Sequence, residues 1–287
     1  MLPDRSRRNF KKMNYANTIP KSLFPLFLII ILLSSCKDNE GVIFSIEDDV
    51  RLGQQVAHEV DSTYRANGQL LDRNANTQKA YTHLDNIVNR VLNSGQVKYR
   101  NEFAWTVKII NDRETLNAFA TPGGYIYVYT GLIGYLNDED HLAGVLAHEI
   151  AHADRRHSVQ QLQRDYGIAI LLSVVLGNNS GTLKQIAGQL AGTLAGLRFS
   201  RDAETEADNT SVQYLAGTNH YACDGTAGFF VRLNQENQGG NTPEFLSTHP
   251  NPENRVQNIQ QQAQQRGCST TSAPDTDFTE LKRALSL

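Results

Sequence analysis

The sequence of 287 residues has few cysteines, no apolar run long enough to span a bilayer, and no internal repeat. Three cysteines are too few for a disulfide-dense small fold. A content of 40% hydrophobic and 20% charged residues excludes a collagen-like or wholly disordered chain. The length allows one domain of good size or two small ones, and there is no clear interdomain linker, so we expect one main domain.

Positive charge is also scarce outside the N-terminal segment. Residues 1–35 hold six basic residues and one acidic residue, which leaves 21 basic and 29 acidic residues in the rest of the chain. An acidic body without a basic stripe argues against nucleic acid, and against an anionic membrane surface, as the main partner.

The N-terminal segment has the features of a signal peptide. Its apolar run, Leu23–Leu33, is 11 residues long, whereas a bilayer span needs about 20. The four residues that end at Cys36, LSSC, resemble a bacterial lipobox, in which the cysteine is lipidated after the preceding peptide is removed. We therefore expect a signal peptide over 1–35, a lipid anchor on Cys36 and a tether over 36–44. An incidental cysteine after a secretory signal is the alternative.

These features place the protein in the bacterial cell envelope, and the expected location is the outer membrane, facing the periplasm. Surface exposure is the alternative, because acidic residues follow Cys36. In an oxidising compartment the remaining pair, Cys223 and Cys268, either forms a disulfide or stays as two buried thiols.

The hydrophobic pattern predicts an α+β fold that is mostly α. Apolar periodicity indicates helices, and alternation indicates strands. The expected elements are helices over 45–62, 79–93 and 183–215, a strand from Phe103 to Ile110, and a strand from Tyr125 to Thr130 after a Pro-Gly-Gly turn. Residues 167–176 are apolar on all sides, which favours a short buried helix. The main domain is expected over 45–265, with a C-terminal tail over 266–287.

The chemistry of the sequence is concentrated in His148-Glu149-Ile150-Ala151-His152. On a helix, His148 and His152 point the same way, so their imidazoles can reach one metal ion. Glu149 is offset by about 100° on the same helix, near the metal without being a ligand. Acidic residues just before this segment suit the start of a helix.

A catalytic zinc site needs a third protein ligand and an open fourth position. His157 is out of register for that role, so we expect a more distant carboxylate. The segment 201–208, RDAETEAD, places Glu204 and Asp208 on one helical face, with Glu206 turned away. Glu204 is the candidate ligand, and Asp208 the candidate hydrogen-bond partner of a histidine. A solvated acidic helix is the alternative for this segment.

At this point the chain resembles the CAAX-endopeptidase-like zinc metallopeptidases, metallopeptidase family 48, of the HtpX-like and BepA-like bacterial type. The resemblance covers about residues 45–265. It rests on four segments, which are NAFATPGGYIYVYTGLI at 117–133, HEIAH at 148–152, SRDAETEAD at 200–208 and STHPNPENR at 247–255. The chain departs from the integral-membrane members in having no multi-span region, and from the BepA-like proteins in the expected absence of a C-terminal helical-repeat domain. The short periplasmic lipoprotein branch is the nearest match.

The resemblance implies a zincin-like (gluzincin) fold, in which the edge strand of a small sheet flanks the active-site helix. It implies one Zn²⁺ per chain, bound by His148, His152 and Glu204, with Glu149 as the base. Asp208 would lie behind the metal, and Asn117 and His249 near the substrate carbonyl. We expect the strand at 125–130 to be the edge that pairs with an extended substrate, although a plain internal strand is also consistent with its pattern.

The leading functional hypothesis is a zinc endopeptidase that hydrolyses peptide bonds of misfolded or unassembled cell-envelope proteins. The alternatives are a largely latent, chaperone-like assembly factor and a structural zinc-binding lipoprotein. His249 has two possible roles. It could occupy the open metal position and keep the enzyme latent, or it could donate a hydrogen bond to the oxyanion. A turn-capping histidine is the alternative to both.

Overall fold

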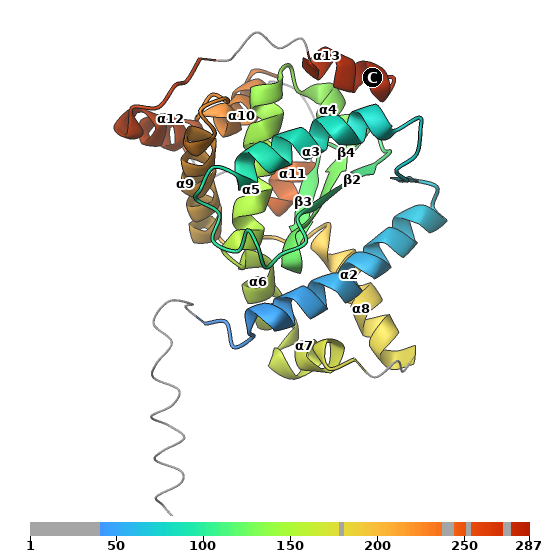
Figure 1. Ribbon diagram of the computed structural model, residues 1–287. Coiled ribbons are helices and arrows are strands. Elements are labelled where there is room, and N and C mark those ends of the chain that lie inside the picture. The colour runs from blue at the N-terminus through green and yellow to red at the C-terminus, as the bar shows by residue number, and fades with distance from the viewer. Residues whose placement is uncertain (1–40, 178–180, 237–243, 251–253, 272–276) are drawn as a thin grey trace, which may run out of the picture. The chain divides into compact units, whose positions relative to one another are not determined.

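The computed structural model describes residues 41–177, 181–236, 244–250, 254–271 and 277–287 (Figure 1). The expected signal peptide and Cys36 lie outside these residues. The chain divides into two units, Met1–Gly41 and Val42–Leu287, and the second contains all the elements described below. They are α2 (Ile46–Ala66), β1 (Leu70–Leu71), α3 (Gln78–Leu92), β2 (Thr106–Ile110), β3 (Ala118–Thr121), the 3₁₀ turn η2 (Pro122–Gly124), β4 (Tyr125–Tyr129), α4 (Thr130–Tyr135), α5 (Glu139–Asp154), α6 (His157–Tyr166), α7 (Ile168–Val175), α8 (Gly181–Leu194), α9 (Arg201–Thr218), α10 (Gly225–Glu236), α11 (Glu244–Thr248), α12 (Arg255–Arg266) and α13 (Asp277–Ala284).

The prediction of a mostly helical α+β fold is confirmed, since the helices surround one small mixed sheet. Strand order is β1-β2-β4-β3, with β2 and β4 parallel and the other two pairs antiparallel. Strand β2 begins later than predicted, at Thr106, because the backbone of Trp105 has a left-handed φ of 41°. No helix among the described residues is long and apolar enough to cross a membrane.

The predicted position of the edge strand at 125–130 is wrong. These residues form β4, which lies between β2 and β3, so both of its edges are already paired. The edge beside the active-site helix is β3, which packs against α5 and reaches β4 through the tight Pro122–Gly124 turn. Strand β3 escaped sequence analysis because all four of its side chains are buried, which leaves no alternation to detect.

The sheet separates two hydrophobic clusters. On one face Ile126 and Val128 of β4 join the core built from α3, α5, α9, α10, α12 and α13. On the other face Tyr127 and Tyr129 join a second core built from α2, α6, α7 and α8. The alternation predicted for this strand is therefore confirmed. Figure 1 shows α5 in the middle of the first group and α2 with α7 and α8 in the second.

Helix α5 is buried along nearly its whole length, because neighbours cover it on several sides. It packs against α9, α10, α3 and β3. At Gly144 the contact with α10 is so close that a Cβ would lie 2.3 Å from the backbone nitrogen of Thr226. Leu142, Leu146 and Ile150 of this helix lie in the first core.

Three other expectations change. The helix expected over 183–215 is two helices, α8 and α9, and α9 begins at an N-cap, Ser200, whose hydroxyl accepts from the Ala203 N–H. The helix at 167–176 is only half buried. The expected tail, 266–287, ends in α13, whose Phe278 and Leu281 belong to the first core. Residues 272–276 of that tail lie outside the described residues.

The corner between α5 and α6 is fixed to the start of α2. Arg156 has a left-handed φ of 62° and is buried, and its Nε and Nη2 donate to the Asp49 carboxylate at 2.6 and 2.9 Å. Its Nη2 also donates to the carbonyl oxygens of Phe44 and Ser45. Removing one partner of such a buried pair typically costs about 3–5 kcal/mol. The first helix of the domain is thus fastened to the end of the active-site helix.

Candidate metal centre and active site

Helix α5 carries His148 and Glu149 on one turn and His152 on the next. It starts at the N-cap Asp138, whose carboxylate accepts from the His141 N–H at 2.9 Å, and acidic residues occupy its first turn, as the sequence predicted. His148 and His152 are four residues apart on this helix and are fully buried. Their Nε2 atoms lie 3.0 Å apart, so both imidazoles point to one place.

Helix α9 lies against α5 and supplies the carboxylates. Glu204 is fully buried and Asp208 nearly so, both on the face toward α5, whereas the Glu206 side chain is 53% exposed. Glu204 Oε2 lies 3.5 Å from His148 Nε2, and Glu204 Oε1 lies 3.4 Å from His152 Nε2. The helical register inferred for 201–208 therefore agrees with the observed placement.

A fourth group, His249, completes the cluster. Its Nδ1 lies 3.0 Å from Glu204 Oε1 and 3.4 Å from His148 Nε2. The donor atoms of His148, His152, Glu204 and His249 all lie within 4.8 Å of one another. Four ligands around a tetrahedral ion with bonds of about 2.0–2.1 Å are separated by about 3.3 Å. The spacing and the chemistry of these donors fit such an ion, so the cluster is a candidate metal-binding site.

The buried carboxyl groups around the cluster also favour a bound cation. Glu149, Glu204 and Asp208 bring three buried carboxyl groups together, and the buried Arg255 contacts two of them. Its guanidinium donates to both oxygens of Asp208 at 2.6 and 2.7 Å and lies 2.9 Å from Glu204 Oε2. A divalent ion together with this arginine would balance the three carboxylates.

Sequence analysis missed Arg255 as part of the site, because only the resemblance drew attention to its segment. The side chain is buried, with its guanidinium 4.1 Å from the centre of the Phe230 ring. It lies at the first residue of α12, 47 residues from its partner Asp208. No local spacing rule connects positions so far apart.

Each metal-facing histidine has a partner on its far nitrogen. His148 Nδ1 lies 3.0 Å from Asp208 Oδ1, where an acceptor for this histidine was expected. His152 Nδ1 lies 2.9 Å from His157 Nδ1, and His157 Nε2 lies 3.3 Å from Glu206 Oε2. Sequence analysis set His157 and Glu206 aside as ligands and overlooked this contact. Such partners fix the ring orientation and the tautomer of a ligating histidine.

The environment shifts the carboxyl groups in opposite directions. Burial raises the pKa of Glu149, which is fully buried, and in the described part of the chain neither of its oxygens makes a well-formed hydrogen bond. Burial alone would also raise the pKa of Glu204, but His249, His148 and His152 together hold that pKa well below its usual range. These directions of the two pKa values suit Glu204 as an anionic ligand and Glu149 as a proton acceptor.

The other two sequence candidates differ in placement. His249 stacks on Phe245, with ring centroids 4.3 Å apart, and its Nε2 lies 3.4 Å from Glu149 Oε1. Asn117, the residue before β3, donates to the Ala195 carbonyl at 3.3 Å and accepts from the Ala118 N–H at 2.9 Å. Within the described residues, no hydrogen bond connects Asn117 to the four-donor cluster.

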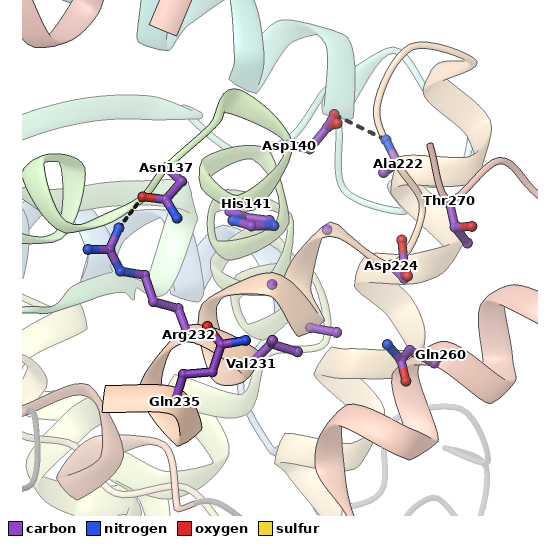
Figure 2. A pocket seen from close by; sticks show the side chains of 13 residues that line it. Asn137, Asp140, His141, Ala222, Asp224, Val231, Arg232, Gln235, Gln260 and Thr270 are labelled. Atoms are coloured by element: carbon purple, nitrogen blue, oxygen red, sulfur yellow. Dashed lines mark hydrogen bonds between the residues drawn. The ribbon is translucent and has the colours of Figure 1, made fainter. Parts of the chain in front are cut away.

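Two further features lie away from the cluster. Cys223 and Cys268 form a disulfide that joins the segment before α10 to the segment after α12. A polar cavity of about 260 Å³ opens beside the N-terminal end of α5 (Figure 2). Figure 2 shows Arg232 reaching toward Asn137, and Asp140 accepting from the Ala222 N–H, at its edge. None of the candidate metal ligands lines this cavity.

The sequence model of peptidase family M48 matches residues 78–263, well over half of the chain and all four donors of the cluster. The chain belongs to peptidase family M48. The predicted resemblance to the BepA-like type of this family is confirmed.

Several relatives are similar to this chain over long segments. A beta-barrel assembly-enhancing protease of Yersinia pestis is 29% identical over 264 residues, which are 88% of this chain and 51% of that protein. Mitochondrial metalloendopeptidase OMA1 of Schizosaccharomyces pombe is 28% identical over 226 residues, 76% of this chain and 61% of that protein. Metalloprotease YcaL of Escherichia coli is 31% identical over 148 residues, 50% of this chain and 57% of that protein. The chain thus spans about half the length of these relatives.

Proposed function

We propose that this chain is a zinc-dependent endopeptidase that hydrolyses peptide bonds of misfolded or unassembled cell-envelope proteins. The observation that carries the proposal is the four-donor cluster with Glu149 buried beside it. Catalytic zinc is commonly bound by two histidines and one glutamate, with a fourth coordination position for water or substrate. The family relationship adds peptide hydrolysis as the type of reaction.

His148, His152 and Glu204 would hold the zinc ion. When bound, zinc polarises a peptide carbonyl and makes water more acidic. Glu149 then takes a proton from the attacking water and passes it to the leaving amine. A raised pKa suits this role, because the carboxyl group must both accept and release the proton near neutral pH.

The resting enzyme in this proposal is latent. The four donors and Glu149 are each at most 1% exposed, so a polypeptide cannot reach them without a rearrangement. His249 lies at the end of the short segment Glu244–Thr248 and fills the fourth position of the cluster. Movement of this segment would free both that position and the space beside Glu149. The closed site therefore also supports the alternative hypothesis, a largely latent assembly factor. This would be a second mode of action of the same protein.

An extended substrate would pair with β3, which replaces the strand at 125–130 in this role. Strand β3 is the sheet edge that packs on α5, so a chain added there would run past Glu149. Its side chains are buried, and the Ser158 hydroxyl donates to the Ala120 carbonyl. Opening of the site must therefore also uncover this edge. Backbone hydrogen bonds select an extended conformation more than a particular sequence, which favours unfolded polypeptides as substrates.

The proposed location is the bacterial envelope, with Cys36 lipidated and the domain facing the periplasm at the outer membrane. The lipobox-like LSSC segment supports the anchor. The name of the Yersinia relative refers to the assembly of β-barrels, which are outer-membrane structures in bacteria. Metabolic labelling with a fatty acid should mark the wild-type protein and leave Cys36→Ser unlabelled. Equal labelling of both would rule out this anchor.

The proposed activity is tested by casein digestion with and without a chelator, beside Glu149→Gln. This substitution keeps the metal ligands and removes the base, so metal content should stay and hydrolysis should fall about a hundredfold or more. Glu102→Gln, at an exposed loop carboxylate, is the matched control and should behave like the wild type. Because the resting state is closed in this proposal, Glu149→Gln and Glu102→Gln are also introduced into the His249→Ala protein, and their hydrolysis is compared with that of His249→Ala alone. Full turnover by metal-loaded Glu149→Gln would falsify the assignment.

A further inference from the structure

Exposed large hydrophobic side chains gather in one region of the molecule. Within the residues that the structure describes, the four such side chains are Ile43 at 68%, Ile170 at 38%, Leu172 at 37% and Leu176 at 74% exposure. Three of them belong to α7 or its C-cap, and Ile43 lies in the segment that leads into α2. Helix α7 packs against both α2 and α6, and Figure 1 shows it beside the first turns of α2.

Helix α7 has one packed face and one exposed face, and both are apolar. Leu171, Val174 and Val175 point into the second core. The opposite side presents an exposed surface, here named the α7 face, made of Ala169, Ile170, Leu172 and Leu176. Residues 166–183 contain no charged residue. A helix whose outer face meets only water normally has polar residues there, so this surface is suited to an apolar environment.

The chain enters the domain at the same place. The backbone N–H of Ile43 donates to the Gln163 side chain of α6, and Phe44 is part of the second core with Leu171. Cys36 is only seven residues before Ile43. Seven residues reach at most about 25 Å when fully extended. A lipid anchor at Cys36 would therefore keep this side of the domain close to the membrane.

We infer that the α7 face, together with Ile43, inserts into the interfacial region of the bilayer to which Cys36 is anchored. The inference rests on the lipid anchor of the proposed function. The occupant is lipid because the exposed apolar residues coincide with the point where the tether enters. The surface carries no positive charge and the body is acidic, so apolar burial and not attraction to anionic headgroups holds it there. Insertion therefore does not require anionic lipid.

The contact would also set the direction in which the active site faces. Helices α6, α7 and α8 form the connection between α5, which carries His148, and α9, which carries Glu204. Two points of attachment, the acyl chains and the α7 face, hold a domain in one orientation, whereas a single flexible tether leaves it free to rotate. The proposed metal centre would then lie at a fixed distance from the lipid surface when a substrate polypeptide approaches.

The test uses the full-length lipidated protein with one added cysteine. Cys36 would be acylated and Cys223 is bonded to Cys268, so an introduced thiol is the one that labels. Leu176→Cys carries an environment-sensitive fluorophore on the α7 face. Lys79→Cys is the control, an exposed site on α3, which packs on the opposite side of the sheet. Both proteins are reconstituted into phosphatidylcholine vesicles that contain nitroxide-labelled acyl chains, and into vesicles with added phosphatidylglycerol.

We expect the label at position 176 to be quenched at least threefold more than the label at position 79, in both lipid compositions. Equal quenching at the two positions in protein that floats with the vesicles would overturn the insertion while leaving the anchor intact. Protein that does not float overturns the anchor, and the inference with it. Quenching at position 176 that is lost in a Leu172→Asp background, with flotation unchanged, would support the apolar contact directly. A label that is shielded from aqueous quencher but not quenched by lipid would assign the surface to a protein partner and overturn the inference.

Discussion

His249 Nε2 lies 3.4 Å from Glu149 Oε1, while Nδ1 of the same ring lies 3.0 Å from Glu204 Oε1. One imidazole thus contacts both the proposed base and a metal-binding carboxylate. It cannot leave one without leaving the other, because both contacts depend on the position of the same planar ring. The two roles considered for this histidine therefore need different positions of the ring. The described position is the one that would close the site under the proposed function.

Replacement of His249 should raise basal proteolysis. His249→Ala removes the fourth donor and opens space beside Glu149, so casein digestion is expected to increase several-fold at matched zinc occupancy. His220→Ala, at an exposed histidine, is the control for the loss of an imidazole as such. A lower rate would mean that oxyanion stabilisation dominates, and an unchanged rate would mean that His249 has neither role.

The two nearby glutamates of α9 should differ in their effect on metal content. Glu204→Gln removes the buried anionic donor, and the purified protein should lose most of its zinc. Glu206 is half exposed and touches His157, so Glu206→Gln should retain zinc. Metal analysis after dialysis against a weak chelator measures both. Loss of zinc from the second variant alone would show that the proposed ligand is the wrong one.

The contact between His157 and His152 should contribute to metal affinity. His157→Asn removes the group that orients the far nitrogen of His152, and affinity is expected to fall about 10–100-fold. Chelator competition measures the change without reference to activity, and His220→Asn is the matched control. Recovery of affinity in His157→Gln, whose amide reaches further than that of asparagine, would separate an orienting role from a packing defect. Equal affinities for wild type and His157→Asn would exclude the role.

Removal of the metal should destabilise the fold. Without a cation, Glu149, Glu204 and Asp208 face one arginine in a buried space. At free zinc of one hundred times Kd, the bound ion adds about 2.7 kcal/mol to the free energy of unfolding. For a domain of this size that corresponds to a fall of about 5–10 °C in Tm on chelation. Glu204→Gln should show little further change with chelator, and an equal shift in that variant would point to metal bound elsewhere.

The disulfide should be present in protein from an oxidising compartment and should matter for stability. Under denaturing conditions Cys223 and Cys268 should be unreactive toward thiol reagents until a reductant is added. The bond closes a loop across a sequence separation of 45 residues. Chain-entropy arguments give it about 4 kcal/mol. Reduced protein, and the Cys223→Ser Cys268→Ser variant, should unfold at lower denaturant concentration. Two freely reactive thiols in untreated protein would contradict the bond.

The features that could be predicted from sequence depend on short-range periodicity. His148 and His152 are one helical turn apart, and so are Glu204 and Asp208, so each pair follows from the geometry of a single helix. The N-cap at Asp138 and the alternation of Tyr127 with Val128 are equally local. For these features the chain within a few residues determines the outcome, and the structure agrees with the prediction.

The features that escaped prediction depend on contacts between distant segments. The position of β4 inside the sheet follows from its pairing with β2 and β3 on both sides, which no pattern within the strand reveals. Arg255 meets Asp208, and His157 meets Glu206, only after α5, α9 and α12 have packed together. The apolar character of α7 was visible, but whether neighbours cover one of its faces or both is decided by the packing of α2, α6 and α8.

The ion pair between Arg156 and Asp49 couples the start of α2 to the C-terminal end of α5. Peeling α2 away would leave a buried guanidinium without its carboxylate, one residue before the helix that contains His157. Fraying from the tether side and disorder of the imidazole pair on α5 are therefore expected in the same event. A molecule in which α2 detaches would then also lose the proposed metal site. Such a damaged molecule would be inactive and would not remain as an unregulated protease.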